Sequence, residues 1–98
     1  MLTGFLIGFH SPSQRTEAYV QNVAVHPAER RTGLARRMYD EFFDQAIADG
    51  RIVVRAITSP SNQQSIDFHR RMGFAVTGPI TDYNGPDRDV VVFSRSLR

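Results

Sequence analysis

The sequence contains no cysteine and no tryptophan, and it has no long hydrophobic run. Without cysteine the chain has no disulfide, no thiolate metal ligand and no cysteine nucleophile. No apolar segment approaches the length that spans a bilayer, and no signal peptide is visible. From these absences we expect a cytoplasmic protein that holds no metal and has no membrane partner.

Lysine is also absent, so all twelve basic residues are arginines, against ten acidic residues. The net charge of +2 and the pI near 9.7 make the chain mildly basic, which suits a small anionic ligand. No segment carries the dense basic stripe of a nucleic-acid-binding protein, so we expect no nucleic acid partner. With 98 residues, 41% of them hydrophobic, the chain is predicted to form a single domain over residues 1–98.

The spacing of apolar residues predicts secondary structure in the order β-β-α-β-α-β-β. The expected elements are strands at 4–9 and 18–25, a helix at 34–48, a strand at 51–58, a helix at 61–72, and strands at 74–78 and 89–97. Ser61 and Gln64 form a capping box that begins the second helix. This order predicts an α/β fold with a mixed, mostly antiparallel sheet and two helices packed on it.

The same spacing predicts which side chains share a face. In the first helix, the buried stripe contains Leu34, Ala35, Met38, Tyr39, Phe42, Phe43, Ala46 and Ile47. In the second strand, simple alternation puts Tyr19, Gln21, Val23 and Val25 on one face and Val20, Asn22 and Ala24 on the other.

The stretch from 23 to 37 has the pattern of a buried strand, a short basic turn and the start of a helix. The first N–H groups of a helix have no partner within it, and with the helix dipole they favour a bound phosphate. Gly33 lets the backbone approach a ligand closely because it has no Cβ. Arg30 and Arg31 lie where the dipole disfavours cations, so an anion between them would remove that conflict. The alternative is a solvated basic turn without a ligand.

Two motifs resemble those of the GNAT acetyltransferase superfamily. The first is Arg30-x-x-Gly33-x-Ala35 after Val25-x-Pro27, which is similar to the family's Gln/Arg-x-x-Gly-x-Gly/Ala signature. The second is Asn62-x-x-Ser65-x-x-Phe68-His69-x-x-x-Gly73-Phe74, which is similar to the family's Asn-x-x-Ala-x-x-Phe-Tyr-x-x-x-Gly-Phe. The two motifs occur in the family's order, and with the final hairpin the resemblance covers nearly the whole chain. It implies an acyl-CoA N-acyltransferase-like fold.

The resemblance also implies that the cofactor is acetyl-coenzyme A. The backbone of Val23 and Val25 would pair with the pantetheine arm, and Asn62 would bond the same arm from the second helix. The N–H groups of residues 30–35 would hold the pyrophosphate. The implied cofactor-binding residues are Val23, Ala24, Val25, Arg30, Arg31, Thr32, Gly33, Leu34, Ala35 and Asn62.

The resemblance points to two catalytic candidates. His69 replaces the tyrosine that many relatives use to protonate the leaving thiolate, and histidine can donate a proton near neutral pH. A half-buried histidine paired with a carbonyl is the equal alternative. Glu17 is the candidate base, acting through water, because Gln21 stands where many relatives have a glutamate. An exposed carboxylate at the strand edge is the alternative.

The implied function is transfer of an acetyl group to a primary amine of a small molecule or peptide. A non-catalytic acyl-CoA-binding module is the alternative. Relatives usually carry roughly sixty more N-terminal residues, which cover one sheet edge and help to build the acceptor pocket. Because an exposed edge strand invites association, we expect either a homodimer or a fragment of a longer acetyltransferase.

Overall fold

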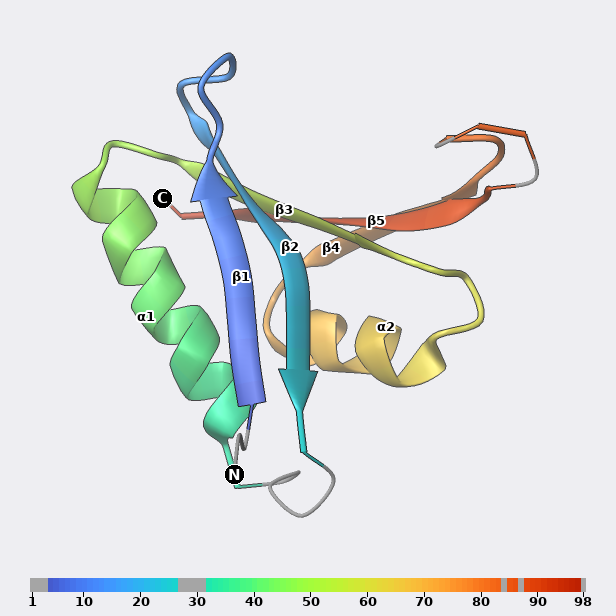
Figure 1. Cartoon of the computed structure of the whole chain (residues 1–98), viewed down its shortest axis with the longest axis horizontal. Helices are drawn as coiled ribbons and strands as arrows, with labels where there is room; N and C mark the ends of the chain where they lie inside the picture. The colour runs from blue at the N-terminus through green and yellow to red at the C-terminus, as the bar shows by residue number, and fades with distance from the viewer. Residues whose placement is uncertain (1–3, 27–31, 84, 87, 98) are drawn as a thin grey trace.

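The computed structural model describes residues 4–26, 32–83, 85–86 and 88–97 and has the predicted order of elements. These are β1 (Gly4–His10), β2 (Glu17–Val25), α1 (Leu34–Ala48), β3 (Val53–Thr58), α2 (Gln63–Arg71), β4 (Ala75–Ile80) and β5 (Val90–Ser96). The five strands form one sheet in the order β1-β2-β3-β5-β4 (Figure 1). Only β2 and β3 are parallel among the described strands, which confirms the mixed, mostly antiparallel α/β fold.

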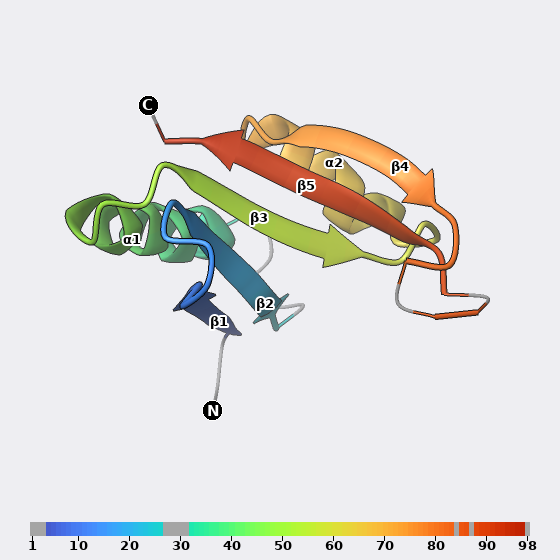
Figure 2. The same cartoon turned by 90° about the horizontal axis from the view of Figure 1, so that it is seen from above.

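The two helices share one core against the sheet. β1 and β4 are the sheet edges, with α1 beside β1 and β2 and α2 beside β4 (Figure 2). Tyr39 of α1 meets Phe68 of α2, with ring centroids 6.0 Å apart. The buried hydrophobic core is Ala18, Val20, Tyr39, Phe42, Phe43, Ala46, Val54, Ala56, Ile66, Met72, Phe74, Val91 and Phe93. The predicted stripe of α1 is wrong at Ile47, which is 52% exposed, whereas its neighbour Ala46 is fully buried.

A β-bulge interrupts the pairing of β1 with β2. Ile7 lies opposite Asn22 but Gly8 lies opposite Val20, so β2 has one extra residue, Gln21. Val20 is buried, and beyond the bulge Val23 also packs against the core. The predicted alternation along β2 is therefore wrong after Val20, since the extra residue changes the phase by one. At Gly8 a Cβ would lie 2.5 Å from the nearest atom of a buried phenylalanine ring, so only glycine fits.

Beyond the bulge, β2 separates from β3. Their parallel pairing covers only Glu17–Val20 and the facing residues Val53–Ala56, although β2 continues to Val25. β3 instead stays paired along its whole length with β5. The divergence of β2 from β3 is visible in Figure 1, where β2 turns away from the rest of the sheet. Residues after Val20 therefore have a strand partner on the β1 side only.

The second helix begins one residue later than the capping box predicted. Asn62 is the N-cap residue, and its side-chain oxygen accepts a hydrogen bond from the Ser65 N–H at 3.2 Å. Its amide nitrogen donates to the hydroxyl of Thr58, also at 3.2 Å. Ser61 instead contacts the hydroxyl of Ser59 at 2.9 Å. The predicted cap at Ser61 is therefore wrong, because the asparagine side chain provides the oxygen.

Strand β3 begins two residues later than predicted, and Arg51, before it, holds the first hairpin. Its guanidinium donates to the carbonyls of Ser11, Gln14 and Arg15 at 2.8, 3.2 and 2.9 Å. These bonds satisfy carbonyl groups of the turn, of which that of Gln14 also accepts from the Glu17 N–H at 3.0 Å. Arg51 thus holds the turn that leads into β2.

The described residues offer no membrane-spanning helix and no metal-binding cluster. None of the helices in this part of the chain is long and apolar enough to cross a bilayer. No three histidine, aspartate or glutamate residues within the same ranges come together as metal ligands.

Candidate functional site

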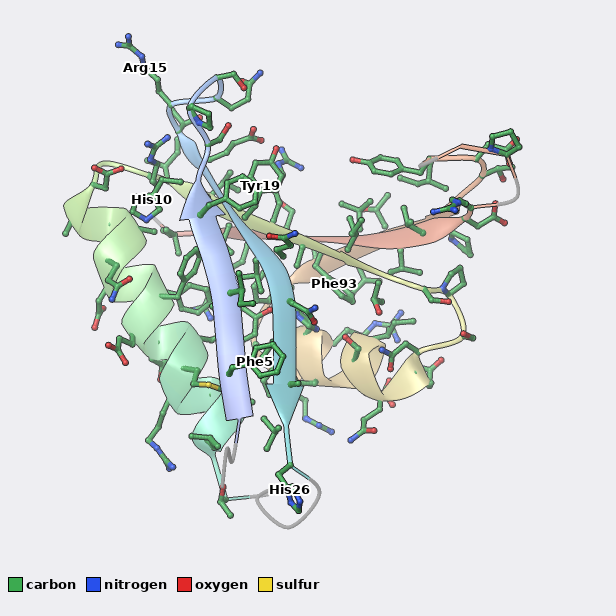
Figure 3. All side chains as sticks on the ribbon, in the orientation of Figure 1. Phe5, His10, Arg15, Tyr19, His26 and Phe93 are labelled. Atoms are coloured by element: carbon green, nitrogen blue, oxygen red, sulfur yellow. The ribbon has the colours of Figure 1, made fainter. Side chains whose placement is uncertain are left out.

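A groove of about 870 Å³ lies between the free half of β2, the start of α1 and helix α2. Its lining residues are Val23, Ala24, Val25, Gly33, Leu34, Ala35, Arg36, Asn62, Gln64, Ser65, Asp67, Phe68, His69 and Arg71. Seven of the ten residues that the resemblance implies for cofactor binding are in this set. Figure 3 labels Tyr19 near the start of β2 and His26 just beyond its end, and the part of β2 that lines the groove lies between them. The groove therefore joins the two motifs, which are separated in sequence by a helix and a strand.

The start of α1 presents free backbone donors to this groove. Gly33 is the N-cap residue, no side chain caps the helix, and its first turn contains no acidic residue. The N–H groups of the first turn therefore keep the positive end of the helix dipole open. Gly33 has φ of 83°, and a Cβ there would meet nothing closer than a guanidinium nitrogen of Arg37 at 3.5 Å. Its backbone conformation, more than crowding, is what favours glycine.

The basic side chains around the groove differ in part from those the sequence indicated. Arg30 and Arg31 lie outside the described residues, so their predicted roles stay predictions. Thr32 does not line the groove, and its carbonyl accepts a hydrogen bond from Arg37 at 3.1 Å. Arg36 from α1 and Arg71 from α2 do line it, and the sequence analysis missed both. Arg36 carried the available signal, because a cation in the first turn of a helix also opposes the dipole.

The free half of β2 presents backbone groups to the gap beside β3. Backbone groups of successive strand residues point to alternate sides. The Ser11 N–H donates to the Glu17 carbonyl at 3.0 Å, which sets the phase of the pairing with β1. Carried through the bulge, this alternation directs the N–H and C=O groups of Val23 and Val25 into the gap. An extended ligand lying there could pair with them as another strand would.

His69 forms part of the groove wall, but its ring is buried in the core with only 2% of the residue exposed. Nδ1 lies 2.7 Å from the Ser65 carbonyl, and Nε2 lies 2.7 Å from the Tyr39 hydroxyl. Because a carbonyl only accepts, the ring proton is on Nδ1, and Tyr39 donates to Nε2. The ring also stacks on Phe93 at 4.0 Å. Both nitrogens are therefore engaged, which favours the structural alternative over proton donation to a ligand.

The surroundings of His69 also keep it neutral. Burial lowers the pKa of His69 below its ordinary value of 6.5, and the hydrogen bond to the Ser65 carbonyl opposes that shift only in part. Burial likewise raises the pKa of the Tyr39 phenol, so Tyr39 stays protonated. A neutral histidine that accepts from a protonated tyrosine holds the two helices together.

Glu17 lies in a second cavity of about 400 Å³, away from His69. Tyr19 donates to one oxygen of its carboxylate at 3.0 Å, and Nε of Arg55 donates to the other. Its side chain is 14% exposed, so the exposed carboxylate that the sequence left open is not what the structure shows. Burial, followed by the hydrogen bond to Glu17, raises the pKa of Tyr19. The structure therefore does not bring the two predicted catalytic residues together.

The second cavity lies on the face of the sheet that α1 and α2 leave uncovered. The side chains of Tyr19, Arg55 and Val92 alternate with core residues along three neighbouring strands and so point away from the helices. Val20 and Ala56, the last paired residues of β2 and β3, also line this cavity. With Gln21 and Ile57 also in its lining, the cavity reaches past this last pair to where the gap between the strands opens, and the groove lies on the other face.

Sequence reasoning missed Arg55. A lone arginine within the β-branched run of residues 52–58 was the available signal, because a strand buried on both faces would exclude it.

Known proteins match both the sequence and the fold. A family model described as Acetyltransferase (GNAT) family matches residues 2–74. An L-2,4-diaminobutyric acid acetyltransferase of Vibrio cholerae is 36% identical over 66 residues, which is 66% of this chain and 38% of that protein. An L-methionine sulfoximine/L-methionine sulfone acetyltransferase of Salmonella typhimurium is 38% identical over 56 residues, which is 57% of this chain and 33% of that protein. The chain thus spans less than half the length of these relatives.

Solved structures share the fold. A putative GNAT acetyltransferase of Desulfovibrio desulfuricans superposes with a TM-score of 0.86 at 18% identity, covering 98% of this chain and 62% of that one. The yncA protein of Salmonella typhimurium, solved with its cofactor acetyl-CoA, has a TM-score of 0.79 at 26% identity, covering 100% and 60%. The family match over most of the chain, together with the fold, shows that this chain belongs to the GNAT acetyltransferase family.

Proposed function

We propose that the chain binds acetyl-coenzyme A in the groove and transfers its acetyl group to a primary amine of a small molecule or peptide. The observation that carries this proposal is the groove itself, where an uncapped helix start meets an unpaired strand edge. The names of the two sequence relatives, both acetyltransferases of small amines, support the same reaction class. An acetyl-CoA-bound neighbour supports the choice of cofactor.

The donor set of the groove fits coenzyme A. The free N–H groups at the start of α1 suit a diphosphate, and Arg36 and Arg71 supply charge beside them. The backbone of Val23 and Val25 suits the amides of an extended arm. Asn62 has one amide hydrogen left for the same arm, because its oxygen and its other hydrogen are used in capping and in the bond to Thr58.

When bound, acetyl-coenzyme A supplies an activated thioester. One backbone N–H near Val25 would donate to its carbonyl oxygen and stabilise negative charge there, while the other gap-facing groups of Val23 and Val25 pair with the arm. The substrate ammonium carries three protons. Glu17 accepts one through water and passes it to solvent, and one remains on the amide product. Because His69 is locked in the core, a water molecule protonates the thiolate and takes up the third proton in exchange. Positioning provides most of the acceleration.

The proposal is tested by comparing two glycines at opposite ends of α1. Gly33 and Gly50 both have a left-handed backbone, with φ of 83° and 78°, and a Cβ at either would meet no atom closer than 3.4 Å. Alanine at either position is expected to cost about 1 kcal/mol of stability through backbone strain. Only Gly33→Ala should weaken coenzyme A binding, because only Gly33 aims the N–H groups of the helix start.

Calorimetry with coenzyme A and thiol release with a broad amine panel are the measurements. Equal coenzyme A affinity in the two alanine variants would contradict the proposed binding site. Tight binding with no thiol release from any amine would favour a non-catalytic acyl-CoA-binding module. The observation that favours this second function is that both ring nitrogens of His69 are hydrogen-bonded in the core, so His69 cannot donate a proton to a ligand.

A further inference from the structure

The second cavity contains an ion pair that the proposed acetyl transfer to a simple amine does not fully use. Its lining is Glu17, Tyr19, Val20, Gln21, Arg55, Ala56, Ile57, Tyr83 and Val92. Glu17 and Arg55 are the only charged residues in this lining, so the cavity offers one negative and one positive group side by side. Its volume of about 400 Å³ falls in the range that accepts a small molecule.

The guanidinium of Arg55 is only partly engaged. It donates to Glu17 through Nε, and its side chain is 40% exposed. Within the described residues, its two terminal nitrogens make no hydrogen bond. A guanidinium held by Nε still presents its terminal N–H groups as a planar fork, which matches a carboxylate. A neutral amine without an acid group would leave this fork unused.

Glu17 is held in place but keeps acceptor capacity. Tyr19 and Arg55 each donate to one of its oxygens. A carboxylate has about four lone-pair positions, so it can also accept from an ammonium group. The ring of Tyr19 stacks on Phe9 at 5.4 Å, which fixes the phenol beside Glu17. The carboxylate of Glu17 is therefore a positioned acceptor next to the terminal N–H groups of Arg55, which have no partner among the described residues.

We propose that the acceptor of this site is a free amino acid, bound as a zwitterion by Arg55 and Glu17 together. The α-carboxylate pairs with the terminal nitrogens of Arg55, and the α-ammonium donates to Glu17. The α-amine and α-carboxylate are joined through one carbon, so they match two protein groups that are themselves in contact. The side chain of the amino acid meets Ile57, Val92 and Tyr83. This inference rests on the proposed acetyl transfer and assigns Arg55 as the residue that selects the acceptor.

The cavity is placed to deliver that amine. Val20 and Ala56, which line it, are the last pair before β2 and β3 separate. An amine beside Glu17 therefore approaches the gap from the uncovered face, opposite the groove assigned to the cofactor.

The first test removes the carboxylate from the acceptor. Thiol release from acetyl-coenzyme A is measured with the standard L-amino acids, and then with the carboxamide and the decarboxylated amine of the best one. Loss of the carboxylate is expected to lower kcat/KM by about 100-fold, because a charge-assisted bidentate pair is lost. Equal kcat/KM for the acid, the amide and the amine would overturn the proposal.

The second test removes the guanidinium of Arg55 from the protein. Arg55→Gln is expected to lower kcat/KM for the amino acid by about 100-fold and to change that for its carboxamide by less than about 3-fold. Arg15→Gln is the matched control, since Arg15 points outward at the tip of the first hairpin (Figure 3). It should leave both values unchanged. An equal loss on both substrates in Arg55→Gln would mean a structural role for Arg55 and would contradict the inference.

A binding measurement separates failure of this inference from failure of the proposed function. Saturation-transfer NMR detects binding of L-amino acids and of their carboxamides to the wild type and to Arg55→Gln, with coenzyme A present. Arg55-dependent amino acid binding without thiol release would support the zwitterion site and count against acetyl transfer. Thiol release from simple amines, with no preference for a carboxylate, would support acetyl transfer and count against the zwitterion site.

Discussion

Glu17 and His69 make an informative pair because both are titratable residues with a polar partner on each side, yet their surroundings are opposite. His69 lies under the sheet among the rings of Tyr39, Phe74 and Phe93, with ring centroids 5.4, 5.1 and 4.0 Å away. Glu17 lies on the uncovered face and borders a cavity. The partners of His69 use both of its nitrogens, whereas the partners of Glu17 leave lone pairs unused. Only Glu17 is therefore available to a substrate.

The difference follows from which face of the sheet each side chain meets. His69 points from α2 toward the strands, so it is enclosed by the same side chains that form the core. Glu17 starts a strand whose outward face has no helix over it. A motif can thus place a histidine at a position where relatives use a tyrosine, while the packing around it assigns that histidine a structural role.

The largest contrast is expected from Glu17→Gln. The amide keeps one oxygen to accept from Arg55, and its NH2 group can donate to the Tyr19 hydroxyl, but it cannot take a proton from an ammonium group. We expect kcat to fall by about 100-fold, the lower range for loss of a general base, while the free energy of unfolding changes by less than about 1 kcal/mol. Steady-state thiol release and urea denaturation measure the two quantities.

Asp44→Asn serves as the control for Glu17→Gln, because Asp44 is an exposed carboxylate on α1. It should leave both kcat and the free energy of unfolding within error of the wild type. An unchanged kcat in Glu17→Gln would show that Glu17 takes no part in proton transfer. Glu17 and His69 would then differ only in how exposed they are.

Tyr39→Phe tests the other member of the pair. The substitution keeps the ring in the core but leaves Nε2 of His69 without its donor, 2.7 Å away in the wild type. Loss of a partner for a buried polar atom is expected to lower the free energy of unfolding by about 1–3 kcal/mol. With a structural His69, kcat should change by less than about 3-fold once the protein is folded. A large loss of kcat with unchanged stability would instead return His69 to catalysis.

The sequence predicts the elements well where the signal is local. The bounds of α1, Leu34–Ala48, follow from the apolar period and from Gly50 after its end. The order of strands and helices follows in the same way. The bulge in β2 could not be predicted, because it depends on the close contact of Gly8 with a ring of α1, which is distant in sequence. That bulge reverses the faces of the strand beyond Val20.

In the candidate site, too, the sequence predicts what is encoded locally and misses what depends on contacts between distant residues. The sequence predicts the start of α1 and the free half of β2 as ligand-binding, since both are encoded in one continuous stretch around Gly33, and both line the groove. It also predicts a ligand contact for Asn62, which lines the same groove, but not that its oxygen caps α2. The role of His69 and the partnership of Arg55 with Glu17 depend on residues 30 and 38 positions apart, so no local pattern carries them.

The pH dependence of stability is expected to give the smallest effect, and it tests directly whether the buried His69 is neutral. The pKa of His69 is lowered from 6.5 in the folded chain by burial, so the unfolded chain takes up a proton first as the pH falls. Stability from this group is therefore complete above about pH 6.5 and is lost as the pH falls below it. The loss is at most about 1.4 kcal/mol per pH unit and ends at the lower, folded-state pKa.

Urea denaturation at a series of pH values from 8 to 5 measures this slope. His69→Phe is the subtraction variant, because it keeps an aromatic ring against Phe93 and removes the titrating group. The difference between the two proteins should be constant above about pH 6.5 and should shrink below it, since only the wild type loses this stabilisation. A difference that grows as the pH falls would mean that protonated His69 is stabilised in the folded chain. The ring would then hold a proton where a ligand in the groove could receive it, and the contrast with Glu17 would disappear.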